Sequence, residues 1–97
     1  MQTLLDRNLA QHPTVVETLV GGEAVMLHLE DDSYFGLDII GTEIWYAIAN
    51  DLALRETCMR LAEKCGQTKQ RVELDVQSLL EDLLDANLIV FADENSS

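Results

Sequence analysis

Basic residues are scarce in this sequence. Six Lys and Arg stand against 18 Asp and Glu, which gives a formal net charge of -12. A surface this negative repels phosphate backbones and anionic lipid headgroups, because it offers no basic patch that could displace their counterions. The composition therefore argues against nucleic acids and membrane surfaces as partners.

Long apolar runs and cysteines are also few. The longest apolar stretches span only a few residues, and charge interrupts the chain between Met1 and Arg7 before a signal-peptide core could form. Two cysteines, Cys58 and Cys65, are too few for a secreted disulfide scaffold. We expect a reduced, cytoplasmic protein without a membrane segment or an export signal.

Patterns that would hold a small ligand are missing as well. Gly21-Gly22 lacks the further glycines, the lysine and the hydroxyl of a phosphate loop. His12 and His28 lack the short spacing of a zinc site, and the acidic runs lack the residue order of a calcium loop. The sequence therefore predicts no cofactor, no metal ion and no catalytic residue. His28 is expected to be a partly exposed strand residue.

Ninety-seven residues allow one compact domain. Residues 1–13 are expected to form a polar N-terminal lead-in that ends at Pro13, and residues 14–92 to form the ordered domain. Residues 93–97 are expected to form an acidic, flexible tail. No repeat or linker divides the chain.

Three strands are expected first. Residues 15–20 and 24–29 flank Gly21-Gly22, which favours a β-hairpin because glycine tolerates the positive φ of a two-residue turn. An acidic turn then leads to a short third strand, Tyr34–Leu37. These strands predict an antiparallel meander with the third strand at one edge.

Three helices follow, because the apolar period changes from two to about 3.6 after Leu37. Asp38 is the expected N-cap of the first helix. The second covers about residues 54–64, ends at Gly66 and is expected to carry both cysteines on its core-facing stripe. The third begins at residue 68 or 69 and ends at about residue 86. Its apolar residues cover an arc of roughly 140°, wider than the ~100° of a helix that faces one core; these are Val72, Val76, Leu79, Leu80, Leu83 and Leu84.

The third strand carries an unusual residue. Gly36 in its middle weakens a strand unless a bulge or a closely approaching backbone requires it. The strand also lacks the charge or proline that normally protects a sheet edge. An open edge beside a wide apolar stripe can receive an extended peptide by strand addition. Alternatively, residues 88–91 cover that edge or stripe, and the residue patterns leave both possibilities open.

The run Tyr34-Phe35-Gly36-Leu37-Asp38, followed by Ile39 to Trp45 and, in the last helix, by Asp75-Val76 and Leu79-Leu80, resembles the PqqD family. That family includes the pyrroloquinoline quinone biosynthesis protein D and the stand-alone leader-binding proteins of lasso-peptide pathways. The resemblance extends from about Val15 to Val90. It implies a winged-helix-like α+β fold, a three-stranded antiparallel sheet packed on a three-helix bundle, without catalysis of its own.

The resemblance also implies a function. Such domains bind the leader of a ribosomally made precursor peptide, which adds as a strand to Tyr34–Leu37 and places side chains in the groove against the third helix. Lys69 and Arg71 are candidates to meet an acidic leader side chain. The residues expected to bind the peptide are Ser33, Tyr34, Phe35, Gly36, Leu37, Asp38, Lys69, Arg71, Val72, Asp75, Val76, Leu79, Leu80 and Leu83.

The expected role is that of an adaptor, a monomer or weak homodimer, in lasso-peptide-type maturation, with a leader peptidase or cyclase as its enzyme partner. The alternative is a partner of a radical SAM enzyme in the biosynthesis of a quinone cofactor or another modified peptide. Two rivals belong to other classes. A winged-helix DNA-binding regulator is disfavoured by the net charge and the acidic third helix, and a redox protein built on Cys58 and Cys65 would need accessible thiols.

Overall fold

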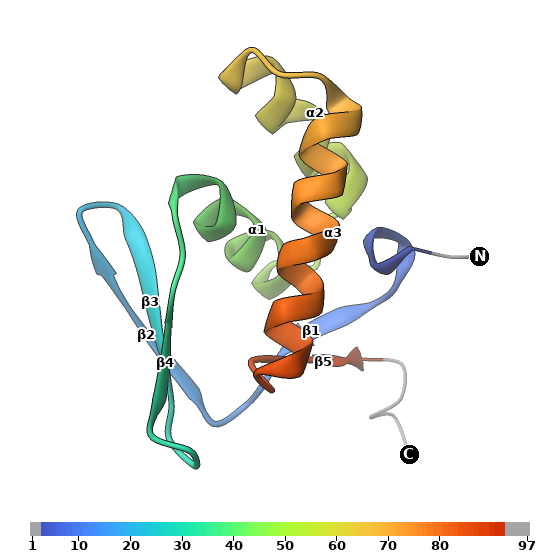
Figure 1. Ribbon diagram of the computed structural model, residues 1–97. Helices are drawn as coiled ribbons and strands as arrows, with labels where there is room; N and C mark the ends of the chain where they lie inside the picture. Colours follow the sequence, from blue (N-terminus) through green and yellow to red (C-terminus); the bar gives the residue numbers. More distant parts are fainter. Residues whose placement is uncertain (1–2, 93–97) are drawn as a thin grey trace.

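The structure is a computed structural model that describes residues 3–92 (Figure 1). Within that range, no helix is both long and apolar enough to span a bilayer. The tail expected at residues 93–97 lies outside the described residues. The elements, in chain order, are the 3-10 helix η1 (Leu4–Asp6), β1 (Leu9–Gln11), β2 (Val15–Val20), β3 (Glu23–His28), β4 (Ser33–Gly36), α1 (Ile39–Ala49), α2 (Leu54–Cys65), α3 (Lys69–Asp85) and β5 (Ile89–Phe91).

The expected α+β fold is confirmed. Strands β2, β3 and β4 form an antiparallel sheet in that order; helix α1 packs against β3, and α2 and α3 pack on α1 and on each other. The β2–β3 turn uses Gly21 and Gly22 with φ of 61° and 85°, the two positive values that a type I′ turn requires. In Figure 1, α1 lies between the sheet and α3, and η1 lies on the other side of α3.

The helix ends follow local sequence signals. The Asp38 side chain caps α1 by accepting a hydrogen bond from the Gly41 backbone N–H at 2.7 Å. Thr68 caps α3 by accepting one from the Arg71 backbone N–H at 3.2 Å. Gly66 ends α2 in the left-handed region, and Asn87 takes the same conformation after α3.

One face of the sheet packs against α1 and is hydrogen-bonded to it. Along β3 every second residue is buried, namely Ala24, Met26 and His28. The Ala24 backbone N–H donates a hydrogen bond to Thr42 Oγ1 at 2.8 Å, and Trp45 Nε1 donates one to Glu17 Oε1 at 2.6 Å. Residues of β2, β3 and α1 therefore share one core.

The expectation that residues 1–13 form a polar lead-in needs correction. Strand β1 pairs antiparallel with β5, with Leu9 opposite Phe91 and Gln11 opposite Ile89. Leu5 and Leu9 are buried in the core. Strand β1 has only three residues, too few to show a period in the sequence. Its partner β5 lies near the other end of the sequence. The pairing therefore had no local signal.

The same pairing decides where the C-terminal segment lies. Strand β5 belongs to the β1–β5 sheet, and β4 pairs only with β3 among the described residues. Leu88 and Ile89 are buried, and the Leu88 backbone N–H donates a hydrogen bond to the Leu83 carbonyl at 2.9 Å. The segment thus packs against the end of the α3 stripe and leaves the edge of β4 uncovered.

Candidate functional site

The open edge of β4 is the first component of the candidate site. The Leu37 backbone N–H donates a hydrogen bond to the Ala24 carbonyl at 2.8 Å, and Phe35 lies opposite Met26. Hydrogen-bonding direction alternates along an antiparallel strand. Phe35 therefore bonds to β3, whereas the backbone N–H and C=O of Tyr34 and Gly36 point to the open side. No described strand pairs with them.

Gly36 has no structural role that only glycine could fill. Its φ is not positive, and a Cβ built on it would meet nothing within 4 Å. Neighbouring Tyr34 is 77% exposed, so the outer surface of this strand is bare. The fold therefore does not explain a glycine in β4, and the close approach of another chain remains a physical reason for it.

The second component is the side of α3 that faces β4. Gln77 marks the opposite side, because its Oε1 accepts a hydrogen bond from the Leu4 backbone N–H in η1 at 3.0 Å. At about 100° per residue, Leu79 lies roughly 160° from Gln77 around the helix, and Asp75 and Asp82 lie close to Leu79. These three residues therefore line the flank of α3 nearest the sheet (Figure 1).

Most of the wide apolar stripe of α3 is not a groove wall, which corrects the expected placement of side chains there. Val72, Val76, Leu80 and Leu83 are at most 1% exposed and belong to the core. The wide arc is covered by α2, η1, α1 and β5, which all pack on α3. Leu79 alone among the five apolar residues expected to receive a peptide remains half-buried.

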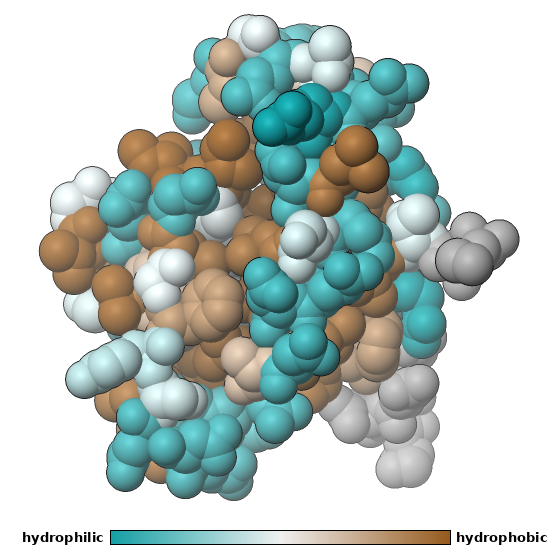
Figure 2. All heavy atoms as spheres, viewed as in Figure 1, coloured by the Kyte–Doolittle hydropathy of each residue, from teal (hydrophilic) through white to brown (hydrophobic). Residues whose placement is uncertain are grey.

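Apolar surface remains between β4 and α3. Phe35, Ile40 and Leu79 are half-buried and pack against the core. Figure 2 shows hydrophobic atoms gathered in a hollow between the sheet and the hydrophilic front of α3. This strip and the outward backbone groups of Tyr34 and Gly36 are hereafter called the β4 groove.

The polar residues expected at the site are separated by the fold. Arg71 pairs with Asp75 at 3.5 Å on the β4 side of α3, and both side chains are exposed. Lys69 lies 3.9 Å from Glu73, which in turn pairs with Arg55 of α2 at 3.3 Å. Lys69 therefore leans away from the β4 groove. Ser33 is exposed at the start of β4, and Asp38 is occupied as the cap of α1.

His28 is buried at 2% exposure, which corrects its expected partial exposure. Its ring centroid lies 4.8 Å from that of His12, and ligand atoms of both and of Glu30 lie within 4.8 Å of one another. His12 Nδ1 accepts from the Thr14 backbone N–H at 3.1 Å, and His28 Nδ1 from the Glu30 backbone N–H at 3.3 Å. In the neutral rings Nε2 then carries the proton and has no lone pair for a metal ion. His28 Nε2 is buried and has no hydrogen-bond partner among the described residues.

The two cysteines do not form a redox pair. Cys58 is buried, and burial raises the pKa of its thiol to about 11, so thiolate is scarce at neutral pH. Cys65 is exposed, which corrects its expected place on the core-facing stripe, because α2 ends there beyond the core. Seven residues of helix separate the two by about 10 Å, too far for a disulfide.

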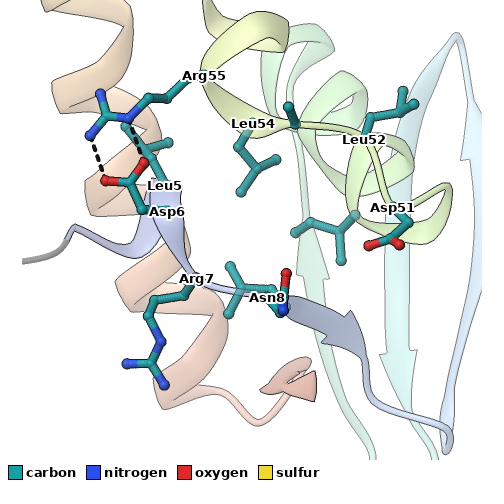
Figure 3. A pocket seen from close by; sticks show the side chains of 11 residues that line it. Leu5, Asp6, Arg7, Asn8, Asp51, Leu52, Leu54 and Arg55 are labelled. Carbon is teal, nitrogen blue, oxygen red and sulfur yellow. Dashed lines mark hydrogen bonds and ion pairs between the residues drawn. The ribbon is translucent and has the colours of Figure 1, made fainter. Parts of the chain in front are cut away.

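An open pocket lies away from β4, between η1, β1 and the α1–α2 loop (Figure 3). Its volume is about 420 Å³, and residues 5–9, Ile48 and 51–55 line it. Arg55 bonds both oxygens of Asp6, at 2.6 and 2.8 Å, and this hydrogen bonding lowers the pKa of that carboxyl. Residues of the supposed lead-in form one wall, so the sequence held no sign of the pocket.

Comparisons with known proteins agree with this architecture. The family described as "Coenzyme PQQ synthesis protein D (PqqD)" matches residues 23–89, well over half of the chain. A solved structure described as "TbiB1 in Complex with the TbiA(beta) Leader Peptide" is similar, with a TM-score of 0.75 and 28% identity, over 82% of this chain and 93% of that one. A search among curated proteins found no match. The chain belongs to the PqqD family.

Proposed function

We propose that this protein is a non-catalytic adaptor that binds the leader segment of a ribosomally synthesised precursor peptide and delivers it to modifying enzymes. The observation that carries the proposal is the edge of β4, which no strand within residues 3–92 covers and where Tyr34 and Gly36 direct their backbone groups outward. The similarity to a structure described as a leader-peptide complex supports it.

Backbone hydrogen bonds and apolar contacts both contribute to the free energy of peptide binding. Two outward residues offer two N–H and two C=O groups, and each hydrogen bond adds only about 0.5–1.5 kcal/mol net. Apolar side chains of the peptide must therefore contribute, and the strip formed by Phe35, Ile40 and Leu79 receives them. The backbone supplies register, and the strip selects side chains.

Lasso-peptide-type maturation is the favoured setting, with a leader peptidase or a cyclase as the enzyme partner. The family description, which concerns coenzyme PQQ synthesis, favours a second setting in which a radical SAM enzyme receives the peptide. Neighbouring reading frames distinguish them. A transglutaminase-like protease beside an asparagine-synthetase-like cyclase supports the first setting, and a radical enzyme supports the second.

Peptides selected from a random display library on the immobilised protein test the binding site. On titration with a selected peptide, we expect backbone amide shifts in β4 and around Leu79, and none in β2. Silence of β4 in that titration would contradict strand addition.

A proline pair makes the test sharper. Gly36→Pro removes an N–H that points outward and so spares the β3–β4 ladder. We expect it to weaken peptide binding about tenfold or more, through the lost bond and the blocked approach. Leu19→Pro is the matched control, because the register places the Leu19 N–H on the open side of β2. Equal affinities of the two variants would argue against the β4 edge.

A further inference from the structure

Helix α3 carries its charges in the order opposite to the one that its backbone dipole favours. Lys69 and Arg71 lie in the first turn, which has no acidic residue. Asp82 and Asp85 lie in the last turn, which has no basic residue. The N-terminus of a helix favours anions and the C-terminus favours cations, so both ends oppose the dipole. Helix stability therefore does not account for this distribution.

The acidic end of α3 shares one end of the molecule with the acidic β3–β4 turn, residues 30–32. The His12 backbone N–H donates to the Leu88 carbonyl, just after α3, at 2.9 Å. The His12 ring lies against that of His28, at the end of β3. The turn and the end of α3 are thus linked through His12. Both lie at the lower end of the molecule in Figure 1.

The carboxylates at this end form none of the ion pairs between residues that the structure describes; they are those of Glu30, Asp31, Asp32, Asp82 and Asp85. Those pairs lie at Arg55, Lys64, Lys69 and Arg71, and their acidic partners are Asp6, Glu43, Glu73 and Asp75. Arg71, which lies on the β4 side of α3, is thus paired within its own helix. One end of the β4 groove is strongly acidic. The other end is less acidic, because Arg71 is paired with Asp75 there and the nearby carboxylates are those of Asp38 and Glu23.

Two adjacent residues at the acidic end point to different sides. Asp82 lies about 60° from Leu79 around the helix, on the β4 side. Glu81 lies toward η1, because its Oε2 accepts a hydrogen bond from Gln77 Nε2 at 3.2 Å. Asp82 therefore faces the β4 groove, whereas Glu81 carries the same charge at the same height and faces away.

We infer that the peptide bound at the β4 groove carries Lys or Arg at the end that lies beside Ser33 and Asp82, and no such excess at the end beside Arg71. The inference rests on the proposed function. Strand β4 leaves the acidic turn at Ser33, and antiparallel pairing is the more stable and commoner arrangement. The basic residues therefore follow the recognised strand on its C-terminal side.

The size of the effect is modest. An exposed ion pair changes affinity by about 1.4- to 5-fold, and salt screens it. Several carboxylates surround the same end, so exchanging the charged flanks of a peptide should weaken binding about fivefold or more at low salt. Because both flanks belong to one peptide, its general attraction to a protein of charge -12 cancels from this comparison.

The test selects peptides from a random display library on wild type, Asp82→Asn and Glu81→Gln. On wild type and Glu81→Gln we expect Lys and Arg to be enriched at the C-terminal flank over the N-terminal one. On Asp82→Asn this asymmetry should shrink, and the affinity of a peptide selected on wild type should fall about two- to fivefold.

Three outcomes would overturn the inference. In the first, the selected peptides lose binding on Gly36→Pro but show no flank asymmetry, or the opposite one. That result contradicts the inference and leaves the proposed function intact. Equal responses of Asp82→Asn and Glu81→Gln remove the role of Asp82. Peptides that bind regardless of Gly36→Pro remove both the inference and the proposed function.

Discussion

The sheet has two outer strands, β2 and β4, and only β2 carries a charged residue that opposes pairing at its open edge. Strand β2 has six residues and β4 has four, and each directs some backbone groups away from β3. On β2, the Glu17 side chain turns toward α1 and accepts the hydrogen bond of Trp45 Nε1. An inward-pointing charge on an edge strand opposes pairing with another strand. The four residues of β4 carry no charge, so the shorter edge is the unprotected one.

Exposed apolar area alone would favour β2 over β4 as the binding edge. Val16, Leu19 and Val20 make β2 more apolar at its surface than β4. Strand addition depends on free backbone groups and on the space beside them, and side-chain exposure measures neither. The two edges therefore differ in the position of one carboxylate, Glu17, and one glycine, Gly36, as well as in hydropathy.

Two proline substitutions within β4 should differ most in their free energy of unfolding. Phe35→Pro removes a ladder bond to Met26 and should lower the free energy of unfolding by about 2–3 kcal/mol or more, because the buried Met26 carbonyl loses its donor. Gly36→Pro should cost less than about 1 kcal/mol, because its N–H points outward. Urea unfolding of both variants measures the difference. Similar losses would show that the direction of the hydrogen bonds is misassigned.

The next effect concerns the protection of β2. Glu17→Thr removes the inward charge and the acceptor of Trp45 Nε1, so we expect a loss of about 1–2 kcal/mol and concentration-dependent self-association. Analytical ultracentrifugation and urea unfolding test both parts. Glu17→Gln, which keeps an acceptor oxygen, is the control for the stability loss. A Glu17→Thr variant that stays monomeric at high concentration would mean that this charge does not protect β2.

A smaller effect should come from filling the bare position in β4. Gly36→Val adds a strand-forming side chain where the structure leaves open space, so it should raise the free energy of unfolding by about 0.5–1 kcal/mol. Gly21→Val is the contrast, since a positive φ of 61° should make it destabilising by about 1–2 kcal/mol. Thermal unfolding gives both signs. Destabilisation by Gly36→Val would indicate that the fold itself needs this glycine.

A still smaller effect is expected on the pKa of Tyr46, which depends on Glu17. A hydrogen bond with the Glu17 carboxylate, aided by burial, raises the pKa of Tyr46 above its ordinary value. Folded Tyr46 then holds its proton more tightly than unfolded Tyr46, so its stabilisation is present below pH ~10 and is lost as the pH rises through the folded pKa. Glu17→Gln should lower that pKa, as measured by tyrosinate absorbance in a Tyr34→Phe background. An unchanged pKa would place Glu17 away from Tyr46.

Features that depend on neighbouring residues could be predicted from the sequence. The Gly21-Gly22 turn, the caps Asp38 and Thr68 and the left-handed ends at Gly66 and Asn87 lie where local patterns place them. The short strand β4 is also predictable, to within one residue at each end, because its turn and the following helix cap delimit it. The peptide-binding role assigned to residues 33–38 remains a prediction.

Local sequence patterns predict strands β2 to β4, the three helices, their order and the short, uncharged character of β4, because these depend on backbone geometry over a few residues. They do not predict η1 or β1. What covers each face follows from tertiary contacts. Contacts between distant parts of the chain pair β1 with β5, bury His28 beside His12 and enclose Val72 and Val76 in the core. A periodic pattern reports that a residue is apolar, whereas burial depends on segments distant in sequence. In the part of the chain that the structure describes, those segments leave the β4 edge uncovered.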